Sequence, residues 1–368
     1  MLAGGTEKLR GDEGYGVPLA AGIEEAIALH GPDVVVDLSD EPVLGPRERL
    51  GLAGRALALG VPYVGSDFRF EPPRLEPYPV PSLAVIGTGK RVGKTAVTGH
   101  VARLLARRLD VVVVAMGRGG PPSPEVVERA PTLDELLERS RAGRHAASDH
   151  LETAVVAGVP TVGCRRCGGG LAGATFVSNV LEGAGLAAAR SPQLVVFDGS
   201  GAAIPPVAVD ARILVAHDLE SGLNAYRALV STLVVTMDER VVAQAEALGR
   251  RAIRFDLRLR PLEPLAGRRA AVFTTGPART DHLEEVVFAS PNLADRAKLR
   301  DDLDRLDADA YVVELKAAAI DLVAETAAQR GVDLVLACNE VVAQELDEAI
   351  LELAEVATEA KAGDNLRR

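Results

Sequence analysis

The chain has 368 residues, a formal net charge of −11 and 48% hydrophobic residues, chiefly alanine, valine and leucine. Domains usually hold about 100–200 residues, so this length predicts two or three of them. The hydrophobic content excludes a disordered chain, and the acidic balance argues against a general nucleic-acid-binding protein. Any anion that the protein binds must therefore meet a local concentration of positive charge.

The cysteine count and the apolar runs predict the compartment. Cys164, Cys167 and Cys338 are the three cysteines, and an odd, low number without a signal peptide indicates a reducing cytoplasm. Apolar runs such as residues 111–116 are far shorter than the roughly 20 residues that span a bilayer, so we expect no membrane partner. The absence of tryptophan, with abundant arginine and proline, fits thermoadaptation, but a GC-rich genome would leave the same bias.

The first 78 residues predict a small α/β unit that ends in a proline-rich linker. Residues 3–8, AGGTEK, resemble the loop after a first strand, yet almost nothing precedes them, so we expect that this unit either lacks its first strand or begins in an unusual way. The segment 69–82, RFEPPRLEPYPVPS, holds five prolines and cannot form a continuous helix or a central strand.

Short β-branched runs alternate with helical patterns along the rest of the chain. This alternation predicts an α/β protein with a P-loop NTPase-type parallel sheet as its core, flanked by smaller N-terminal and C-terminal α/β units. A weaker linker at 258–269 gives three expected units, at residues 1–78, 79–266 and 267–368. The predicted strands are residues 33–38, 83–86, 111–115, 194–197, 213–216, 233–236, 271–274, 311–315 and 334–337.

The stretch AVIGTGKRVGKTAVTGH, residues 84–100, predicts a phosphate-binding loop. A buried strand, a glycine-rich loop, Lys-Thr and a helix follow one another in the order of a P-loop. Successive backbone N–H groups and the helix N-terminus would surround the phosphates of ATP. Lys94 would reach the β- and γ-phosphates, and the Thr95 hydroxyl would bind Mg²⁺. The expected nucleotide-binding residues are Gly87, Thr88, Gly89, Lys90, Arg91, Val92, Gly93, Lys94, Thr95 and Ala96.

This loop departs from the standard pattern G-x-x-x-x-G-K-[ST] at one position. Thr88 stands where the pattern has its first glycine, and Gly87 precedes it by one residue. Lys90 adds a second basic side chain to the loop, so we predict a catalytic role for it beside Lys94. The alternative is a glycine-rich turn with a chance Lys-Thr pair.

An acidic residue at a strand end completes the expected metal site. Asp198 follows four apolar residues and precedes a glycine-rich turn in FDGSGAAIPPV. Its carboxylate could hold Mg²⁺ directly or through water, together with Thr95. A plain turn or helix-capping aspartate is the alternative.

The stretch TVGCRRCGGGLAG, residues 161–173, concentrates cations beside glycines. Arg165 and Arg166 precede three glycines, and this combination of guanidinium and backbone donors suits phosphate or carboxylate oxygens. We predict that both arginines act in catalysis and bind substrate with Gly168 and Gly169. A surface arginine pair in a mobile loop is the alternative.

The two cysteines of this stretch form a lone C-x-x-C. Structural zinc would require a second pair of ligands, which the sequence does not offer, and a thioredoxin-like redox role requires a different setting. Small buried packing residues are the third alternative for Cys164 and Cys167.

A second positive segment, AMGRGGPP, places Arg118 between glycines directly after a predicted strand, where α/β proteins bind ligands. With Lys90, Arg91 and Lys94, these arginines exceed what one nucleotide requires. The sequence therefore predicts a second, highly charged small-molecule substrate.

Six stretches together resemble the cyclic 2,3-diphosphoglycerate synthetase family: the segment from LSDEP to RFEPP, VIGTGKRVGKT, VVAMGRGGPP, GCRRCGGGLAG, SNVLEGA and FDGSGAAIPPV. The likeness runs from about residue 3 to about residue 340, and GTGKRVGKT and DGSGAAIPP are also similar to dethiobiotin synthetase. The resemblance implies ATP-dependent closure of an intramolecular phosphoanhydride in 2,3-diphosphoglycerate, with release of ADP and phosphate. The arginines would hold two repelling phosphates together.

Two further expectations concern assembly and the rival function. Related P-loop enzymes often form dimers, so a homodimer is the default expectation. The rival is a nucleotide switch or metallochaperone in which Cys164 and Cys167 carry a metal.

Other polar residues at predicted element ends remain open. His150 could act as an acid or base or belong to a helix start, and Glu314 with Lys316 could contact substrate or form an exposed ion pair.

Overall fold

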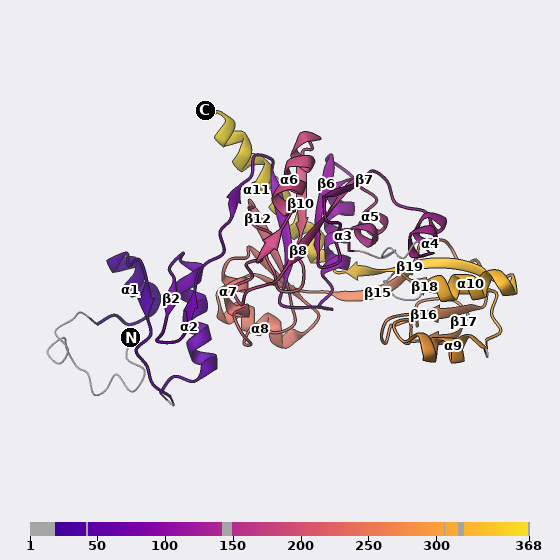
Figure 1. Cartoon of the computed structure of the whole chain (residues 1–368), viewed down its shortest axis with the longest axis horizontal. Coiled ribbons are helices and arrows are strands. Elements are labelled where there is room, and N and C mark those ends of the chain that lie inside the picture. Colours follow the sequence, from indigo (N-terminus) through magenta and orange to yellow (C-terminus); the bar gives the residue numbers. More distant parts are fainter. Residues whose placement is uncertain (1–18, 42, 142–148, 305, 316–319, 367–368) are drawn as a thin grey trace.

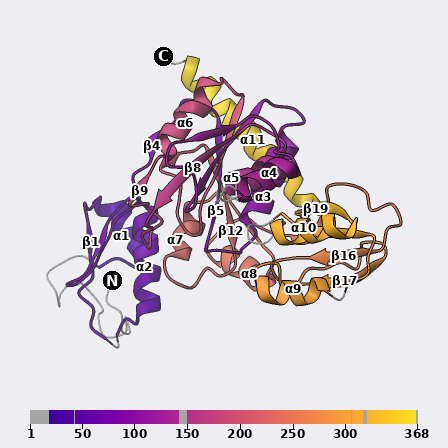
Figure 2. The ribbon, with the colours of Figure 1, turned by 45° about the vertical axis from the view of Figure 1, so that its right-hand side comes forward.

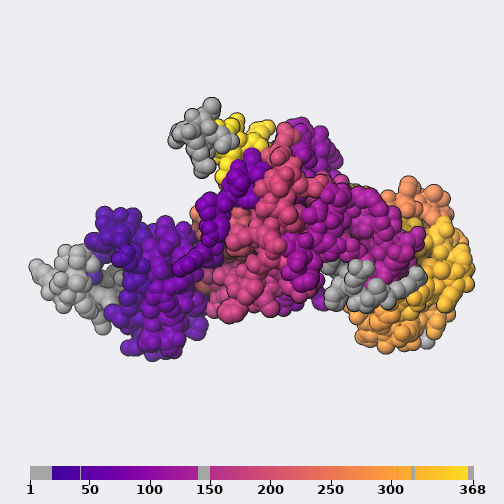
Figure 3. All heavy atoms as spheres, turned by 45° about the horizontal axis from the view of Figure 1, so that its top comes forward, coloured from indigo at the N-terminus to yellow at the C-terminus, as the bar shows by residue number. Residues whose placement is uncertain are grey.

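We describe the protein from a computed structural model, which covers the chain outside residues 1–18, 42, 142–148, 305, 316–319 and 367–368. Figure 1 shows a small N-terminal α/β segment, a central sheet covered by helices and a C-terminal α/β segment. The space-filling view places the N-terminal and C-terminal segments at opposite ends of the central one (Figure 3). Residues 3–8, on which the prediction of a missing first strand depends, lie outside the described residues.

The N-terminal segment forms a three-stranded sheet of order β1-β2-β3 with two helices. A Cβ atom on Gly54 of α2 would lie 3.2 Å from the backbone nitrogen of Tyr226, so α2 packs closely on α7 of the central segment. The proline-rich linker is also fixed, because β4 pairs in parallel with β11. The elements are α1 Ile23–His30, β1 Val35–Val36, α2 Pro46–Ala58, β2 Tyr63–Val64, β3 Arg69–Phe70, β4 Glu76–Pro77, β11 Val207–Ala208 and α7 Asn224–Leu229.

The central sheet has nine strands, with β14-β13-β12-β5-β10-β6-β8-β7 as its path and β9 paired to β8. The strands from β14 to β8 are mutually parallel, and β7 and β9 are antiparallel to β8. Their bounds are β5 Ser82–Gly87, β6 Val111–Gly117, β7 Glu125–Val127, β8 Thr161–Cys167, β9 Val177–Ser178, β10 Leu194–Asp198, β12 Ala211–Ala216, β13 Leu233–Thr236 and β14 Ala252–Arg254.

Two hydrophobic clusters, one on each face, explain why the middle strands read as continuous apolar runs. Leu83 and Val85 of β5 belong to one cluster, whereas Ala84 and Ile86 belong to the other. Every residue of β5, β6 and β10 is buried, as expected for parallel strands covered on both sides. Helices outside the N-terminal and C-terminal segments are α3 Lys94–Leu105, α4 Leu133–Arg141, α5 Asp149–Ala157, α6 Val180–Ala189 and α8 Glu239–Ala247.

The C-terminal segment contains a five-stranded sheet of order β15-β19-β18-β16-β17. The strands from β17 to β19 are parallel, and β15 is antiparallel to β19. The elements are β15 Asp256–Pro261, β16 Ala270–Phe273, β17 Val286–Ser290, α9 Arg296–Asp304, β18 Ala310–Glu314, α10 Ile320–Arg330, β19 Asp333–Val342 and α11 Gln344–Leu366.

Two elements differ from the expected division at residue 266. Strand β15 already belongs to the C-terminal sheet, because its backbone pairs with β19. The last helix, α11, returns to the central segment, where Leu346 and Ile350 share a cluster with Val97 of α3. Figures 1 and 2 show α11 running along the central segment away from the C-terminal sheet. Long-range apolar packing therefore decides where these elements belong.

The parallel P-loop-type core predicted from the sequence is confirmed, and each predicted strand overlaps an observed one. The described residues form 19 strands, and nine were predicted, so ten have no predicted counterpart. The missed strand that matters most for the site is β8, residues 161–167, which lies beside β6 although its arginines and the glycines after it resemble a loop. Within the described residues, no helix is both long enough and apolar enough to cross a membrane.

Candidate active site at the carboxyl edge of the central sheet

The loop between β5 and α3 has the backbone geometry of a phosphate-binding loop. Gly93 adopts a φ of 96°, which glycine tolerates, and Arg91 adopts an unusual positive φ of 61°. A Cβ on Gly87 would lie 2.7 Å from Lys94 Cδ, so only glycine lets the lysine stem fold over the strand end. Lys94 Nζ donates to the Gly89 carbonyl at 2.9 Å, which holds the ammonium group over the loop.

Thr88, at the position where the standard pattern has a glycine, fixes the loop to β12. Its backbone N–H donates to the Val215 carbonyl at 3.2 Å, and its hydroxyl oxygen accepts from the His217 N–H at 3.1 Å. The first bond is a backbone bond that a glycine could also make. The second bond requires the threonine hydroxyl, so the departure from the pattern adds one link between the loop and the end of β12.

Asp198 lies at the end of β10, between β5 and β6 in the sheet. In register it pairs with Val85 on one side and with Ala115 on the other, and it is 3% exposed. Its Oδ1 accepts a hydrogen bond of 2.9 Å from the hydroxyl of Thr98, one turn along α3 from the half-buried Thr95. Thr98 was missed from the sequence, because a threonine inside a helix reads as a packing residue.

The predicted cations gather along the same edge, because the carboxyl ends of parallel strands meet there. Arg118 follows β6 and is exposed, and Gly117 pairs in register with Arg165 of β8. Arg165 is exposed, whereas Arg166 is only 4% exposed. Neighbouring side chains of a strand point to opposite faces, so the two arginines do not act as one flexible pair.

Arg166 lies against the P-loop and the loop after Asp198. One terminal nitrogen donates to the Ser200 carbonyl at 2.8 Å, and the other donates to the Gly168 carbonyl at 2.6 Å. A Cβ on Gly201 would lie 3.2 Å from Arg166 Nη2 and 3.9 Å from Lys90 Cγ. Arg166 and Lys90 therefore flank the same glycine. The guanidinium fixes two loops and brings positive charge beside the P-loop.

Asn179 links Arg165 of β8 to the loop after β6, which carries Arg118. Its Oδ1 accepts from the Arg165 N–H at 2.6 Å, and its Nδ2 donates to the carbonyls of Pro121 and Pro122 at 3.2 and 3.1 Å. The Arg165 guanidinium also donates to the Gly120 carbonyl through Nε at 2.5 Å. The segment SNVLEGA was part of the resemblance, but no role for Asn179 was predicted from it.

Arg227 is a second residue that sequence reasoning missed. It is 2% exposed and donates to the carbonyls of Ala202 and Leu171, at 2.7 and 2.9 Å through Nη2. Burial lowers the pKa of Arg227 to about 10. Its place in an ordinary helical pattern gave no signal, yet it joins the glycine-rich loops after β8 and β10.

The C-x-x-C pair is not a metal site in the described part of the chain. Cys164 is buried and Cys167 is exposed, because positions three apart on a strand face opposite sides. Burial raises the pKa of the Cys164 thiol to about 12, so it stays protonated. Cys164 is therefore a packing residue, and the metallochaperone alternative loses its pair of ligands.

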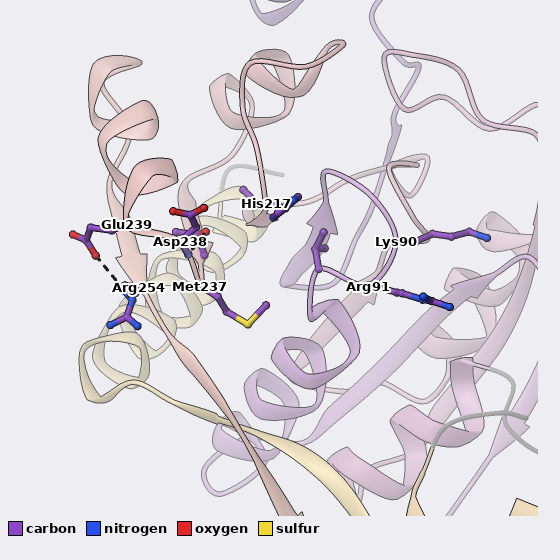
Figure 4. A pocket seen from close by; sticks show the side chains of 10 residues that line it. Lys90, Arg91, His217, Met237, Asp238, Glu239 and Arg254 are labelled. Atoms are coloured by element: carbon purple, nitrogen blue, oxygen red, sulfur yellow. Dashed lines mark hydrogen bonds and ion pairs between the residues drawn. The ribbon is translucent and has the colours of Figure 1, made fainter. Parts of the chain in front are cut away.

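A cavity of about 730 Å³ opens beside the P-loop, between the ends of β12 and β13. Figure 4 shows His217, Met237 and Asp238 on one side of it and the side chains of Lys90 and Arg91 beyond the loop. The lining residues are Lys90, Arg91, Val92, Ala216, His217, Thr236, Met237, Asp238, Glu239 and Arg254.

Two of the other predicted polar residues do not join this edge. His150 is 4% exposed and packs on β8, where a Cβ on Gly163 would lie 2.5 Å from its Cγ. It is the second residue of α5, so it is a buried residue at a helix start, as the second alternative predicted. Glu314, 6% exposed, ends β18 of the C-terminal sheet, where it accepts from Thr275 and Asn339. Lys316 lies outside the described residues.

The fold and this edge define the class of P-loop nucleotide-binding α/β proteins. Three family descriptions match consecutive parts of the chain: the N-terminal domain of cyclic 2,3-diphosphoglycerate synthetase at residues 1–71, its P-loop domain at 82–253 and its C-terminal domain at 261–340. The chain belongs to the cyclic 2,3-diphosphoglycerate synthetase family, which confirms the resemblance inferred from the sequence.

Curated relatives agree over nearly the whole chain. The chain is 49% identical to the cyclic 2,3-diphosphoglycerate synthetase of Rubrobacter xylanophilus, over 98% of this chain and 91% of the relative. It is 40% identical to that of Thermococcus kodakarensis, over 96% and 91%. For the Methanothermus fervidus protein of the same name, the identity is 37% over 97% and 90%.

Proposed function

We propose that this protein catalyses ATP-dependent closure of the intramolecular phosphoanhydride of cyclic 2,3-diphosphoglycerate. ATP would transfer its γ-phosphoryl group to one phosphate of 2,3-diphosphoglycerate and leave as ADP. An oxygen of the neighbouring phosphate would then attack that activated phosphorus and expel inorganic phosphate. This sequence of steps forms one P–O–P ring bond at the expense of one ATP, so atoms and charge balance.

The observation that carries the proposal is the position of Arg166 and Lys90. Both side chains flank Gly201, three residues after Asp198. Arg118 and Arg165 follow on the next two strands of the same edge. Cyclisation requires two phosphates of one molecule to approach each other, and a row of cations beside the nucleotide loop lowers the cost of that approach.

The nucleotide's expected contacts follow from the loop geometry. Gly87, Thr88, Gly89, Lys90, Arg91, Val92, Gly93, Lys94, Thr95 and Ala96 would surround the phosphates. Lys94 would exchange its bond to the Gly89 carbonyl for phosphate oxygens. The cavity beside His217 and Met237 would receive the base and ribose, because it continues from the P-loop along the strand ends.

Thr95 and Asp198 fit a magnesium ion chemically. A hydroxyl and a carboxylate are the hard oxygen ligands that Mg²⁺ prefers, and both belong to elements that meet at the strand end. Bound Mg²⁺ would neutralise charge on the transferring phosphoryl group. Thr98 would orient the Asp198 carboxylate by donating its hydroxyl to Oδ1.

Substrate contacts are assigned to the exposed side of the edge. Arg118 and Arg165 would bind the phosphates and carboxylate of the acid substrate, with backbone N–H groups of Gly168 and Gly169 beside them. Arg166 would act through its charge beside Lys90 and through the two loops that it fixes. The proposal also includes a cytoplasmic location and a homodimer. Sedimentation at known protein concentration would test the homodimer.

Phosphorus NMR of the product is the deciding experiment. With ATP and 2,3-diphosphoglycerate, we expect a new pair of phosphoanhydride resonances together with ADP and phosphate. ADP and phosphate without a new acid resonance would identify a plain ATPase and end the proposal.

Arg165→Ala separates the substrate half of the site from the nucleotide half. Because Arg165 is exposed and lies two strands from β10, the KM for 2,3-diphosphoglycerate should rise about tenfold or more, while the KM for ATP stays within twofold. Arg190→Ala is the matched control, since Arg190 pairs with Glu128 away from this edge. Equal effects on both substrates would contradict a separate anion site.

A further inference from the structure

A second basic cavity lies at the opposite end of the P-loop helix from the nucleotide site. Its volume is about 350 Å³, which falls in the range of small-molecule pockets. Helix α3 rises about 1.5 Å per residue, so Arg103 lies about 14 Å along the axis from Lys94. The lining residues are His100, Arg103, Leu104, Arg107, Arg258, Glu340, Val341, Val342, Ala343, Gln344 and Asp347.

The charges in this cavity do not balance. Arg103, Arg258 and Arg260 lie 4.0, 2.9 and 3.5 Å from the Glu340 carboxylate, so three guanidinium groups share one carboxylate. Arg107 is exposed at the cavity and makes no ion pair with a described residue. The lining therefore holds three arginines and two carboxylates, Glu340 and Asp347, with a fourth arginine, Arg260, beside Glu340, in a protein whose net charge is −11.

Asp347, the second acidic residue of the lining, is paired with a histidine. Its carboxylate lies 2.6 Å from His100 Nε2. His100 Nδ1 is buried and has no hydrogen-bond partner in the described part of the chain, whereas the buried Arg260 Nε lies 3.5 Å from Glu340 Oε1. Buried polar atoms are usually satisfied, so a polar ligand that reached His100 Nδ1 would supply the partner that this atom lacks.

The start of α11 adds to the positive potential. Ala343 precedes the first residue of the helix, Gln344, and alanine has no side-chain oxygen to accept from the first-turn N–H groups. Those groups and the arginines together make a donor set for an anion with several oxygens.

We propose that this cavity binds a small phosphorylated anion, at a site separate from the active site. The bound anion would bridge α3, through Arg103, and the turn after it, through Arg107, to β15 of the C-terminal sheet, through Arg258. It would neutralise the excess charge at the junction of the P-loop helix, the C-terminal sheet and α11. The site therefore couples anion concentration to the attachment of the C-terminal segment.

Inorganic phosphate is the probe, and calorimetric titration is the measurement. The full chain is first saturated with Mg·ADP, so that the P-loop is occupied. Arg107→Gln should weaken the remaining phosphate binding about tenfold, because one charge-assisted hydrogen bond is lost. Arg108→Gln is the matched control: Arg108 is the next residue along the chain, is exposed and does not line the cavity, and its variant should bind as tightly as the wild type.

Glu340→Gln tests the sign of the effect. Removing the carboxylate that competes with the anion should strengthen phosphate binding several-fold and increase the rise in unfolding temperature that phosphate produces. Both Arg107→Gln and Arg108→Gln change exposed residues and should fold normally. The proposal is overturned if these two variants bind phosphate equally well. It is also overturned if chloride at the same ionic strength raises the unfolding temperature as much as phosphate does.

Discussion

The central and C-terminal sheets present two carboxyl edges with opposite character. At the central edge, glycines open the backbone, and Lys90, Arg118 and Arg165 are exposed cations. At the C-terminal edge, Glu314 ends β18 and is closed off: the N–H and hydroxyl of Thr275 each donate to it at 2.8 Å, and Asn339 Nδ2 donates at 2.6 Å.

The C-terminal sheet also has the topology that often marks a ligand site. From β16 the chain continues to β17 on one side, and from β18 to β19 on the other, so β16 and β18 form a switch point. Yet the Glu314 carboxylate at that point already accepts hydrogen bonds from Thr275 and Asn339. A switch point therefore provides a place for a ligand, whereas exposed donors and open backbone provide the binding.

The largest expected effect is at the central edge. Lys94→Ala removes the charge that would stabilise the transferring phosphoryl group, so kcat should fall about a thousandfold or more, with the fold intact. Steady-state kinetics measure kcat, and circular dichroism checks that the fold is intact. Lys298→Ala, on the exposed face of α9, is the control. Retained turnover in Lys94→Ala would remove the P-loop assignment.

Acid should lower the free energy of unfolding through His150, which packs on β8 of the central sheet. Burial, the largest cause, lowers the pKa of His150 to about 4, against about 6.5 in the unfolded chain. The unfolded chain therefore takes up a proton between pH 6.5 and 4 that the folded protein does not. Stability is full above pH 6.5 and falls by about 3 kcal/mol as the pH drops toward 4.

Denaturant unfolding at several pH values, in the wild type and in His150→Gln, measures this loss of stability. His150→Gln removes the titrating group, so its stability should be lower at pH 7 but should change about 3 kcal/mol less than the wild type between pH 6.5 and 4. The same pH dependence in both proteins would assign the acid sensitivity to other groups.

The smallest expected effect is at the C-terminal edge and concerns stability. Glu314→Ala leaves the donors of Thr275 and Asn339 without their acceptor, so the free energy of unfolding should fall by about 2 kcal/mol. We expect kcat and both KM values to stay within twofold. The control is Asp307→Ala, since the Asp307 side chain is 90% exposed. A tenfold loss of kcat with unchanged stability would make this edge a second catalytic surface and end the contrast.

Much of the central site follows from local sequence. The strand, the glycine-rich loop, Lys94 and the buried face of α3 were predicted because they depend on neighbours in the chain. The strand Thr161–Cys167 was missed, because its arginines and following glycines resemble a loop and its pairing with β6 is long-range. Thr98, Asn179 and Arg227 were missed for the same reason, since the site partners described above lie 14 to 100 residues away in sequence.

The sequence by itself determined the alternation of strands and helices, the phosphate loop and the family, because these are properties of short segments and their order. The tertiary structure decided that Arg165 and Arg166 face opposite sides of a strand, that Glu314 is enclosed and that α11 returns to the central segment. Side-chain direction and burial depend on which strand or helix lies alongside. That neighbour is chosen by packing across the whole chain, and no local pattern records it.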